Sequence, residues 1–349
     1  MSRRLMIRRN FAPPAPDLPV LRVGLAGFGP DEEEAIRAAL RASAPGLTWQ
    51  VAPLADADAW CVNGARAQLL PDGTVRIAPG LPSSRSIRVD PRAVDCPLVF
   101  ARLPDSPGFR PQWVFDPAQP ATITAMLRWL EGRLRPLIVQ FHLAAHIAGA
   151  GLDLRACSWH VTLEGRLCAV VNQRSGIGVW ALADPARLPS ARWSRRPESA
   201  NAIPAHFVQT DFSQLMWQYA TRTSRDCLPA HYRTQTLFLR RPPRLPARTL
   251  DDSTLALVRE LGHAPASMAE LRERTGLADA ALVRHLGALY MVGAITADPR
   301  RAPPPRSVID VANSSGFAPV TMLPATARTL GMTVKLIVGT RSNPAGAAG

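Results

Sequence analysis

The pattern of apolar and polar positions in the first third of the chain predicts strands joined by short connections. Between two of the apolar runs, DEEEAIRAALRAS (from Asp31) places apolar residues at helical spacing behind an acidic first turn, and a second helix is expected from about Ala121 to Leu134. Short strands with interspersed helices indicate an α/β domain with a mostly parallel sheet, which we assign to residues 19–135. The expected strands are LRVGLAGF, LTWQVAP, DAWCVNGA, PDGTVRIAPG, CPLVFARL and QWVFDP, which begin at Leu21, Leu47, Asp58, Pro71, Cys96 and Gln112.

The pattern changes after this domain, and residues 136–245 are expected to form a central α+β segment. A helix is expected to run to about Ala148, and SWHVTLEGRLCAVVNQRSGIGVWALAD indicates consecutive strands with a turn at Glu164-Gly165. A polar loop, ARWSRRPESANAIP, is expected next. FSQLMWQYATRTSRDCL, from Phe212, then predicts a helix that is rich in aromatic residues.

Three short helices are predicted in residues 246–300. LDDSTLALVRELGH is the first, and SMAELRERTG is the second, with Ser267 as N-cap, Glu270 three residues later and Gly276 as the stop. LADAALVRHLGALYMVGAI is the third, and the glycine turn before it makes a helix-turn-helix pattern. We therefore expect a C-terminal winged-helix-like helical module.

The formal net charge of +14 changes this picture only slightly. Nearly all of the basic residues are arginines, since Lys335 is the single lysine, and they are scattered along the chain rather than massed on one element. An anionic partner such as nucleic acid, anionic lipid or a nucleotide would explain this balance. A general use of arginine in place of lysine explains it as well, and the scatter favours that second interpretation.

The ends of the chain and its cysteines indicate a cytoplasmic protein. Residues 1–18 are expected to be a flexible basic arm without the apolar core of a secretory signal, and residues 301–349 a Pro- and Ala-rich tail with one strand, MTVKLIVGT. The longest apolar stretch, from Leu137 to Leu152, is shorter than the ~20 residues of a membrane-spanning helix, so no span is expected. The five cysteines are not closely spaced, which argues against a disulfide framework or a zinc site. No cofactor is expected.

The order of the expected strands and helices resembles the receiver domain of bacterial response regulators over roughly residues 20–134. The resemblance rests on this pattern, on a strand that ends in a charged residue before Pro117, and on the amphipathic helix that follows. It implies a flavodoxin-like fold. In receivers, acidic residues after the first strand hold a magnesium ion, an aspartate after the third strand takes the phosphoryl group, and a lysine precedes the proline after the fifth.

This chain departs from the receiver pattern at every position of that chemistry. Asp31 and Glu32 stand a few residues beyond the first strand, and Asn63, whose amide is not a carboxylate nucleophile, ends the third. Ala101 follows the fourth strand, and Asp116 stands in place of the lysine, which replaces attraction of a phosphate by repulsion. We therefore expect a receiver-like domain that serves as a docking surface without phosphotransfer. The alternative is another small α/β domain with a chance Asp-Pro pair.

The helix-turn-helix pattern offers DNA binding as a second function. A recognition helix would begin near Ala278 and enter the major groove, but its first turns offer Asp279 and alanines rather than base-reading side chains. Packing or protein contact is the interpretation that we favour for this module. The residues available for nucleic-acid contact are Arg272, Arg274, Arg284, His285, Arg300 and Arg301.

Two smaller groups of residues carry weaker signals. Arg192, Arg195 and Arg196 lie in the polar loop and resemble the arginine motif of PilZ-type cyclic-dinucleotide receptors, while DVANSSG matches the second motif of those receptors poorly. His142 and His146 are four residues apart and could place two metal ligands on one helix face, but no third ligand is evident. A solvated loop and core histidines are the simpler interpretations.

The sequence as a whole favours a non-enzymatic bacterial signalling regulator or adaptor that acts through protein–protein contacts. A DNA-binding transcriptional regulator is the first alternative, and a cyclic-dinucleotide receptor is the second. No catalytic constellation is recognisable, so an enzyme is the least supported class. Another protein is the expected partner, with DNA as the alternative, and the oligomeric state stays open.

Overall fold

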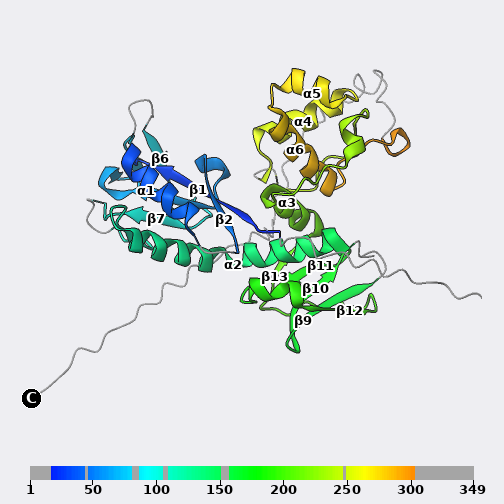
Figure 1. Cartoon of the computed structure of the whole chain (residues 1–349), viewed down its shortest axis with the longest axis horizontal. Helices are drawn as coiled ribbons and strands as arrows, with labels where there is room; N and C mark the ends of the chain where they lie inside the picture. Colours follow the sequence, from blue (N-terminus) through cyan, green and yellow to red (C-terminus); the bar gives the residue numbers. More distant parts are fainter. Residues whose placement is uncertain are drawn as a thin grey trace, which may run out of the picture. The chain divides into compact units, whose positions relative to one another are not determined.

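The computed structural model describes residues 17–43, 46–80, 86–104, 109–150, 157–246 and 249–302 (Figure 1). These residues belong to one compact unit that ends at Pro303. The arm up to residue 16 and the tail from residue 303, including MTVKLIVGT and DVANSSG, lie outside the described residues.

A parallel sheet lies at the centre of the N-terminal third. Its three inner strands are buried on both faces, which explains why they form nearly continuous apolar runs in the sequence. This sheet confirms the prediction of an α/β domain. Its strands are β1 (Val20–Ala26), β2 (Thr48–Ala52), β3 (Ala59–Asn63), β7 (Leu98–Ala101) and β8 (Val114–Phe115), all parallel in the order β2-β1-β3-β7-β8.

The two faces of the parallel sheet are covered differently. Helices α1 (Pro30–Arg41) and α2 (Pro120–Ala150) pack on one face, where Leu21, Ile36 and Met126 are fully buried. The other face carries a second, antiparallel sheet, whose Ile77 packs with Val62 and Phe100 of the parallel sheet. Its strands are β4 (Ala67–Leu69), β5 (Val75–Ile77) and β6 (Ile87–Val89), in that order.

Helix α2 is one continuous helix of 31 residues, where the sequence predicts two. Pro136 lies inside it and lacks the N–H that would bond to the carbonyl of Gly132, a defect that costs about 3 kcal/mol in a helix interior. The helix continues because each half buries its own apolar face. Residues up to Ile138 belong to the core under the parallel sheet, and residues from Val139 onward belong to a second core.

The second core lies under an antiparallel sheet in the order β12-β9-β10-β11-β13. Glu164 and Gly165, in the turn between β9 and β10, both have positive φ, as the predicted two-residue hairpin requires. Helix α3 (Phe212–Arg222) and the second half of α2 pack against this sheet. Helix α3 ends at Arg222, whereas the sequence predicts a helix to Leu228. The strands are β9 (Ser158–Leu163), β10 (Arg166–Asn172), β11 (Gly176–Val179), β12 (Arg192–Arg196) and β13 (Val208–Thr210).

Three helices follow, as predicted, but the third ends at Met291 rather than at the predicted Ile295, because Ile295 belongs to a short strand. The N-cap hydroxyl of Ser267 accepts from the backbone N–H of Glu270, and the Glu270 carboxylate accepts from the N–H of Ser267, which is a capping box. Gly276 ends this helix in the left-handed conformation, with φ 68°. The elements are α4 (Asp252–His263), α5 (Met268–Thr275) and α6 (Asp279–Met291), with the short strands β14 (Phe238–Leu239) and β15 (Ile295–Thr296) paired beside them.

Short 3-10 turns also occur in the described part of the chain. They are η1 (Leu54–Asp56), η2 (Gly64–Arg66), η3 (Pro185–Ser190), η4 (Ala230–Arg233) and η6 (Pro299–Arg301). Within the described ranges, no helix is both long enough and apolar enough to cross a membrane.

Candidate functional site

The carboxyl edge of the parallel sheet holds a closed set of polar contacts. Asn63 is buried at the end of β3, and its Nδ2 donates to Oε2 of Glu32 at 2.9 Å. Its Oδ1 accepts from the N–H of Ala65 at 3.2 Å. Glu32 also accepts from the N–H of Gly29 at 3.0 Å, which caps α1. Each of these polar groups is therefore occupied by a structural partner.

The other receiver-like positions do not join this pair. Asp31 is exposed on the first turn of α1, and Ala101 is fully buried within β7. Asp116 binds its own loop, because its carboxylate accepts from the N–H of Ala118 and from Nε2 of Gln119, both at 3.0 Å. Asp116 thus caps the turn that leads into α2 rather than facing Asn63.

The chain itself covers the end of β1, where the strand order reverses between β1 and β3. Open α/β sheets bind ligands in the crevice at such a point. Here the N–H of Ala78 donates to the carbonyl of Arg66 at 2.8 Å, and the Arg66 guanidinium donates to the carbonyl of Pro79 at 2.7 Å. Gly80 then lies so close to Phe28 that a Cβ on Gly80 would fall 1.6 Å from the Phe28 carbonyl oxygen. The hollow that remains has a volume of about 70 Å³, too small for an organic ligand.

The start of α6, the expected recognition helix, is exposed at Asp279, Ala280 and Arg284, but one expected contact residue is buried. His285, which the sequence suggests could reach outward, is instead buried, and its Nδ1 lies 3.1 Å from the Thr254 hydroxyl. Burial lowers the pKa of His285. On another side of α6, a Cβ on Gly287 would fall 3.3 Å from Cβ of Cys227, so α6 lies directly against the segment that follows α3.

The arginines of this module differ in their surroundings. Arg272 lies 3.3 Å from the carboxylate of Asp279, and Arg274 lies 3.8 Å from that of Glu270. Arg284 is exposed on α6. Arg300 and Arg301 are exposed in η6. The two arginines of α5 are thus already opposite carboxylates of their own module.

The arginines of the expected polar loop lie on a strand. Arg192, Arg195 and Arg196 belong to β12, an edge strand that pairs with β9. Successive side chains of a strand point to opposite faces, so Arg195 lies on the same face as Trp193, and the other two arginines lie on the opposite face. The strand was missed because its residues are mostly polar, which an edge position tolerates.

The two histidines of α2 are packing residues in this structure. The ring of His146 stacks on Trp193, with 4.3 Å between the ring centroids and 10° between the planes. Burial lowers the pKa of both His142 and His146. No group of three metal-binding side chains occurs among the residues that the structure describes.

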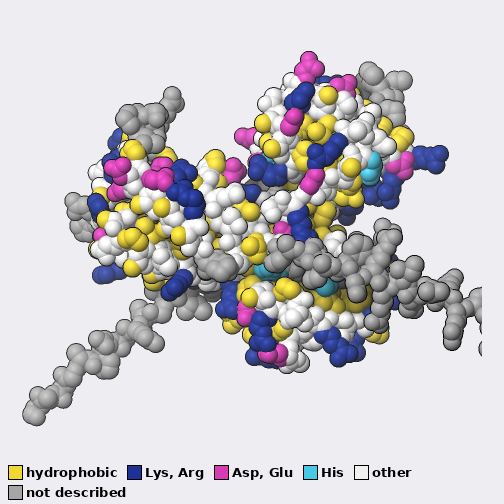
Figure 2. Space-filling model, viewed as in Figure 1, with side chains coloured by type: hydrophobic (Ala, Val, Ile, Leu, Met, Phe, Trp, Pro, Cys, Tyr) yellow, Lys and Arg dark blue, Asp and Glu magenta, His cyan; other side chains and the backbone are white. Residues whose placement is uncertain are grey.

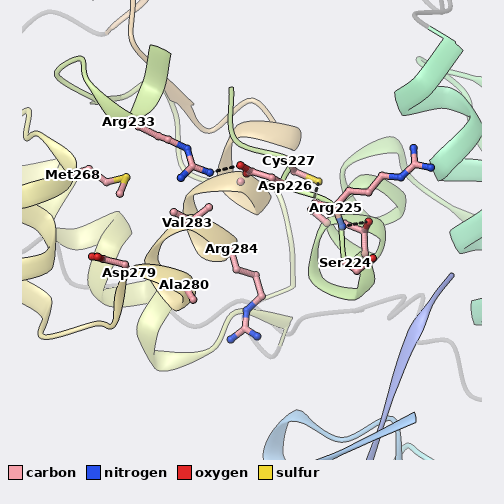
Figure 3. A pocket seen from close by; sticks show the side chains of 13 residues that line it. Ser224, Arg225, Asp226, Cys227, Arg233, Met268, Asp279, Ala280, Val283 and Arg284 are labelled. Atoms are coloured by element: carbon pink, nitrogen blue, oxygen red, sulfur yellow. Dashed lines mark hydrogen bonds and ion pairs between the residues drawn. The ribbon is translucent and has the colours of Figure 1, made fainter. Parts of the chain in front are cut away.

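Besides a hollow of about 470 Å³ that is lined by residues 54–60 and 87–96, two hollows are candidate binding surfaces. The first, the α3–α6 hollow, has a volume of about 470 Å³ and lies between the end of α3, residues 223–227 and the outer side of α6 (Figure 3). The second, the α1–α2 groove, has a volume of about 530 Å³. Apolar side chains are visible over the part of the molecule that contains this groove (Figure 2). Its lining includes Ala35, Ala38 and Ala39 of α1, Ala42 directly after α1, and Ile123, Thr124 and Leu127 of α2.

Asp58 and Asp17 are the centres of buried polar contacts that the sequence does not predict. The carboxylate of Asp58 accepts from the backbone N–H of Arg22 at 2.9 Å and from the guanidinium of Arg222 at 2.5 Å. Asp17, at the end of the expected arm, accepts from the hydroxyls of Tyr219 at 2.9 Å and Thr223 at 2.7 Å. The partners are far apart in the chain, so no local pattern indicates them.

Comparisons with known proteins identify no family for this chain. No family model, curated protein or solved structure matches the chain. Any function proposed for the protein therefore rests on the residues and contacts of this chain alone.

Proposed function

We propose that the protein is a non-enzymatic signalling adaptor with a receiver-like domain that performs no phosphotransfer and binds a partner protein. The strand order supports the receiver-like part of the proposal. Among the parallel strands taken in chain order, β2-β1-β3-β7-β8 is the order 2-1-3-4-5 that flavodoxin-like folds and receivers share. The small antiparallel sheet lies between β3 and β7, where a receiver would have a helix.

The observation that carries the proposal is the contact between Asn63 and Glu32. An aspartyl-phosphate intermediate needs a free carboxylate nucleophile beside a divalent cation held by oxygen ligands. Asn63 supplies an amide at that place, and Glu32, the nearest acid, is committed to Asn63 and to Gly29. At the carboxyl edge of the parallel sheet, these polar groups therefore stabilise the fold and leave no free carboxylate to accept a phosphoryl group.

The α1–α2 groove is the surface that we assign to the partner. Ile123 and Leu127 are almost fully buried in its floor, and the alanines of α1 leave space beside them. Such a groove suits the apolar face of an amphipathic helix, which inserts side chains at helical spacing. Arg128 and Glu131 also line the groove and would pair with charges that flank the apolar face of that helix.

Site-specific photo-crosslinking tests this assignment. A benzophenone amino acid placed at Thr124, which is exposed in the groove, should capture one discrete partner in cells of the source organism. The same amino acid at Gln68, exposed on the small antiparallel sheet, is the control and should not capture it. Ala38→Trp should abolish capture at Thr124 by filling the groove. Equal capture at both positions, or capture that survives Ala38→Trp, would contradict the proposal.

DNA binding is the second candidate, and exposed Arg272, Arg274, Arg300 and Arg301 favour it. The three helices with the β14–β15 pair would then form a winged-helix-like module. Two features oppose this use. The second half of α6 contacts the segment after α3 at Gly287, and the exposed first turn of α6 offers Asp279 and alanines rather than base-reading side chains. Fluorescence anisotropy with genomic duplex fragments separates the two. We expect weak binding that disappears with salt, whereas binding that survives physiological salt and competitor DNA would favour the regulator.

The cyclic-dinucleotide alternative receives less support from the geometry. Because Arg195 lies on the face of β12 opposite to Arg192 and Arg196, the three guanidinium groups do not converge on one ligand. Calorimetric titration with a cyclic dinucleotide should therefore give no binding heat, and saturable heat that Arg192→Ala removes would revive this function.

A further inference from the structure

We propose that the α3–α6 hollow binds a small organic anion: an oxyanion group, such as a carboxylate, sulfonate or phosphate, joined to an apolar body. The proposal goes beyond the adaptor function and does not depend on it. The hollow, of about 470 Å³, is within the range of about 300–1,000 Å³ that is usual for small-molecule sites. It lies apart from the α1–α2 groove in the chain, and none of its lining residues belongs to that groove.

The walls of the hollow suit an apolar body. Ala280 and Val283 line it from α6, Ala220 from α3, and Met268 from the start of α5 (Figure 3). The flexible, polarisable methionine side chain can adjust to ligands of different shape. Cys227 adds a neutral surface, because burial raises the pKa of its thiol to about 11.

The carboxylates that line the hollow are already neutralised. Asp226 pairs with the guanidinium of Arg233, and this ion pair is drawn in Figure 3. Asp279 lies 3.3 Å from Arg272. Neither acid is therefore left to repel an incoming anion at full strength, since each negative charge is screened by an adjacent arginine.

Arg284 is the cation that an anion would meet. It is exposed, and it extends from α6 away from both Asp226 and Asp279 (Figure 3). No ion pair joins it to a carboxylate within the described part of the chain. Its planar guanidinium can donate two parallel hydrogen bonds to an oxyanion, which gives the site both charge and direction.

The surroundings of Arg284 strengthen this preference for negative charge. Burial lowers the pKa of nearby Arg22, and the positive charges of Arg222 and Arg284 lower it further. The guanidinium of Arg22 donates to the carbonyl of Thr221, while the carboxylate of Asp58 accepts from the backbone N–H of Arg22 and from the guanidinium of Arg222. An anion beside Arg284 would offset the mutual repulsion of these guanidinium groups.

The test uses two fluorescent probes that differ in charge. 8-Anilinonaphthalene-1-sulfonate has an aromatic body and a sulfonate, and N-phenyl-1-naphthylamine has a similar body without the anion. The wild-type protein should bind the sulfonate probe at one saturable site, and more tightly than the neutral probe. Arg284→Ala should weaken the sulfonate probe about tenfold, the effect of losing about 1.4 kcal/mol of binding, and leave the neutral probe unchanged.

Two further variants make the test specific. Ala280→Trp fills the hollow from an exposed position on the first turn of α6 and should abolish binding of both probes. Arg259→Ala removes another exposed arginine, on α4 beside Glu260 and outside the hollow, and should bind both probes like the wild type. Circular dichroism confirms that each variant is folded.

The proposal is overturned by any of three results. These are no saturable binding of the sulfonate probe, retention of binding in Ala280→Trp, or equal weakening of both probes in Arg284→Ala. None of these results bears on the α1–α2 groove, since the photo-crosslinking experiment uses different residues.

Discussion

At the scale of single residues, the contact of Asn63 with Glu32 decides which chemistry the sheet edge can support. An amide donates a hydrogen bond where a receiver has a nucleophilic carboxylate, and the acid beside it accepts that bond at 2.9 Å. The sequence shows that Asn63 stands where receivers have the aspartate nucleophile. It does not identify the new pair, because Glu32 and Asn63 are 31 positions apart and neither residue type specifies its partner.

We predict that Asn63→Asp destabilises the protein by about 2 kcal/mol, the usual worth of a hydrogen bond to a charged group. Two carboxylates would then face each other in a partly buried place, so the loss should shrink in acid, where their repulsion is relieved. Urea unfolding at two pH values measures it. The double variant Glu32→Gln, Asn63→Asp restores a donor and should recover most of the stability; an additive loss would contradict the pairing.

Buried histidines give a second prediction at this scale. Burial lowers the pKa of His142, His146 and His285 below their ordinary value of 6.5. Below pH 6.5 the unfolded chain takes up protons that the folded protein resists, so stability should fall as the pH drops. The melting temperature should decrease between pH 7 and pH 5.5, and His285→Gln should make that decrease smaller. A flat profile in the wild type would contradict this account.

At the scale of elements, the local signals of the sequence were sufficient for both ends of α5, but not for the ends of α3 and α6, which stop at Arg222 and Met291, before the predicted Leu228 and Ile295. Ser267, Glu270 and Gly276 each have a defined role in capping, and all three occupy the predicted places. The apolar runs likewise predicted the parallel strands. Two elements were not predictable in this way. Strand β12 is polar because it lies at a sheet edge, and α2 continues through Pro136 because tertiary burial outweighs the local defect.

The capping box supplies a prediction for α5. Ser267→Ala should lower the free energy of unfolding by about 1 kcal/mol, since it removes the side-chain acceptor for the N–H of Glu270. Ser253→Ala, within α4, is the matched control and should be close to neutral or slightly stabilising, because alanine is the better helix former. Urea denaturation of the two variants gives the comparison, and equal losses would argue against the cap.

At the scale of the whole molecule, contacts between distant segments join the N-terminal sheet to α3. Asp58 binds Arg22 in β1 and Arg222 in α3, and both members of the Asp58–Arg222 pair are largely buried. These contacts could not be derived from the sequence, because the partners are 164 positions apart. They have a measurable consequence for stability.

We predict that Asp58→Ala costs about 3 kcal/mol, because it leaves the buried guanidinium of Arg222 without its partner. Asp95→Asn, at an exposed aspartate, should change stability by less than about 0.5 kcal/mol. Thermal unfolding followed by circular dichroism distinguishes the two. A similar small effect at both positions would mean that the pair contributes nothing to the folded state.

We propose that the protein acts by docking a partner on the α1–α2 groove. Hydrogen exchange of the protein, with and without the partner captured at Thr124, tests this most directly. We predict added protection in α1 and in the first turns of α2, with the carboxyl edge and α6 unchanged. Protection confined to α6 or to β12, with α1 and α2 unaffected, would contradict the assignment. The partner would then bind at α6 or at β12 instead of the α1–α2 groove.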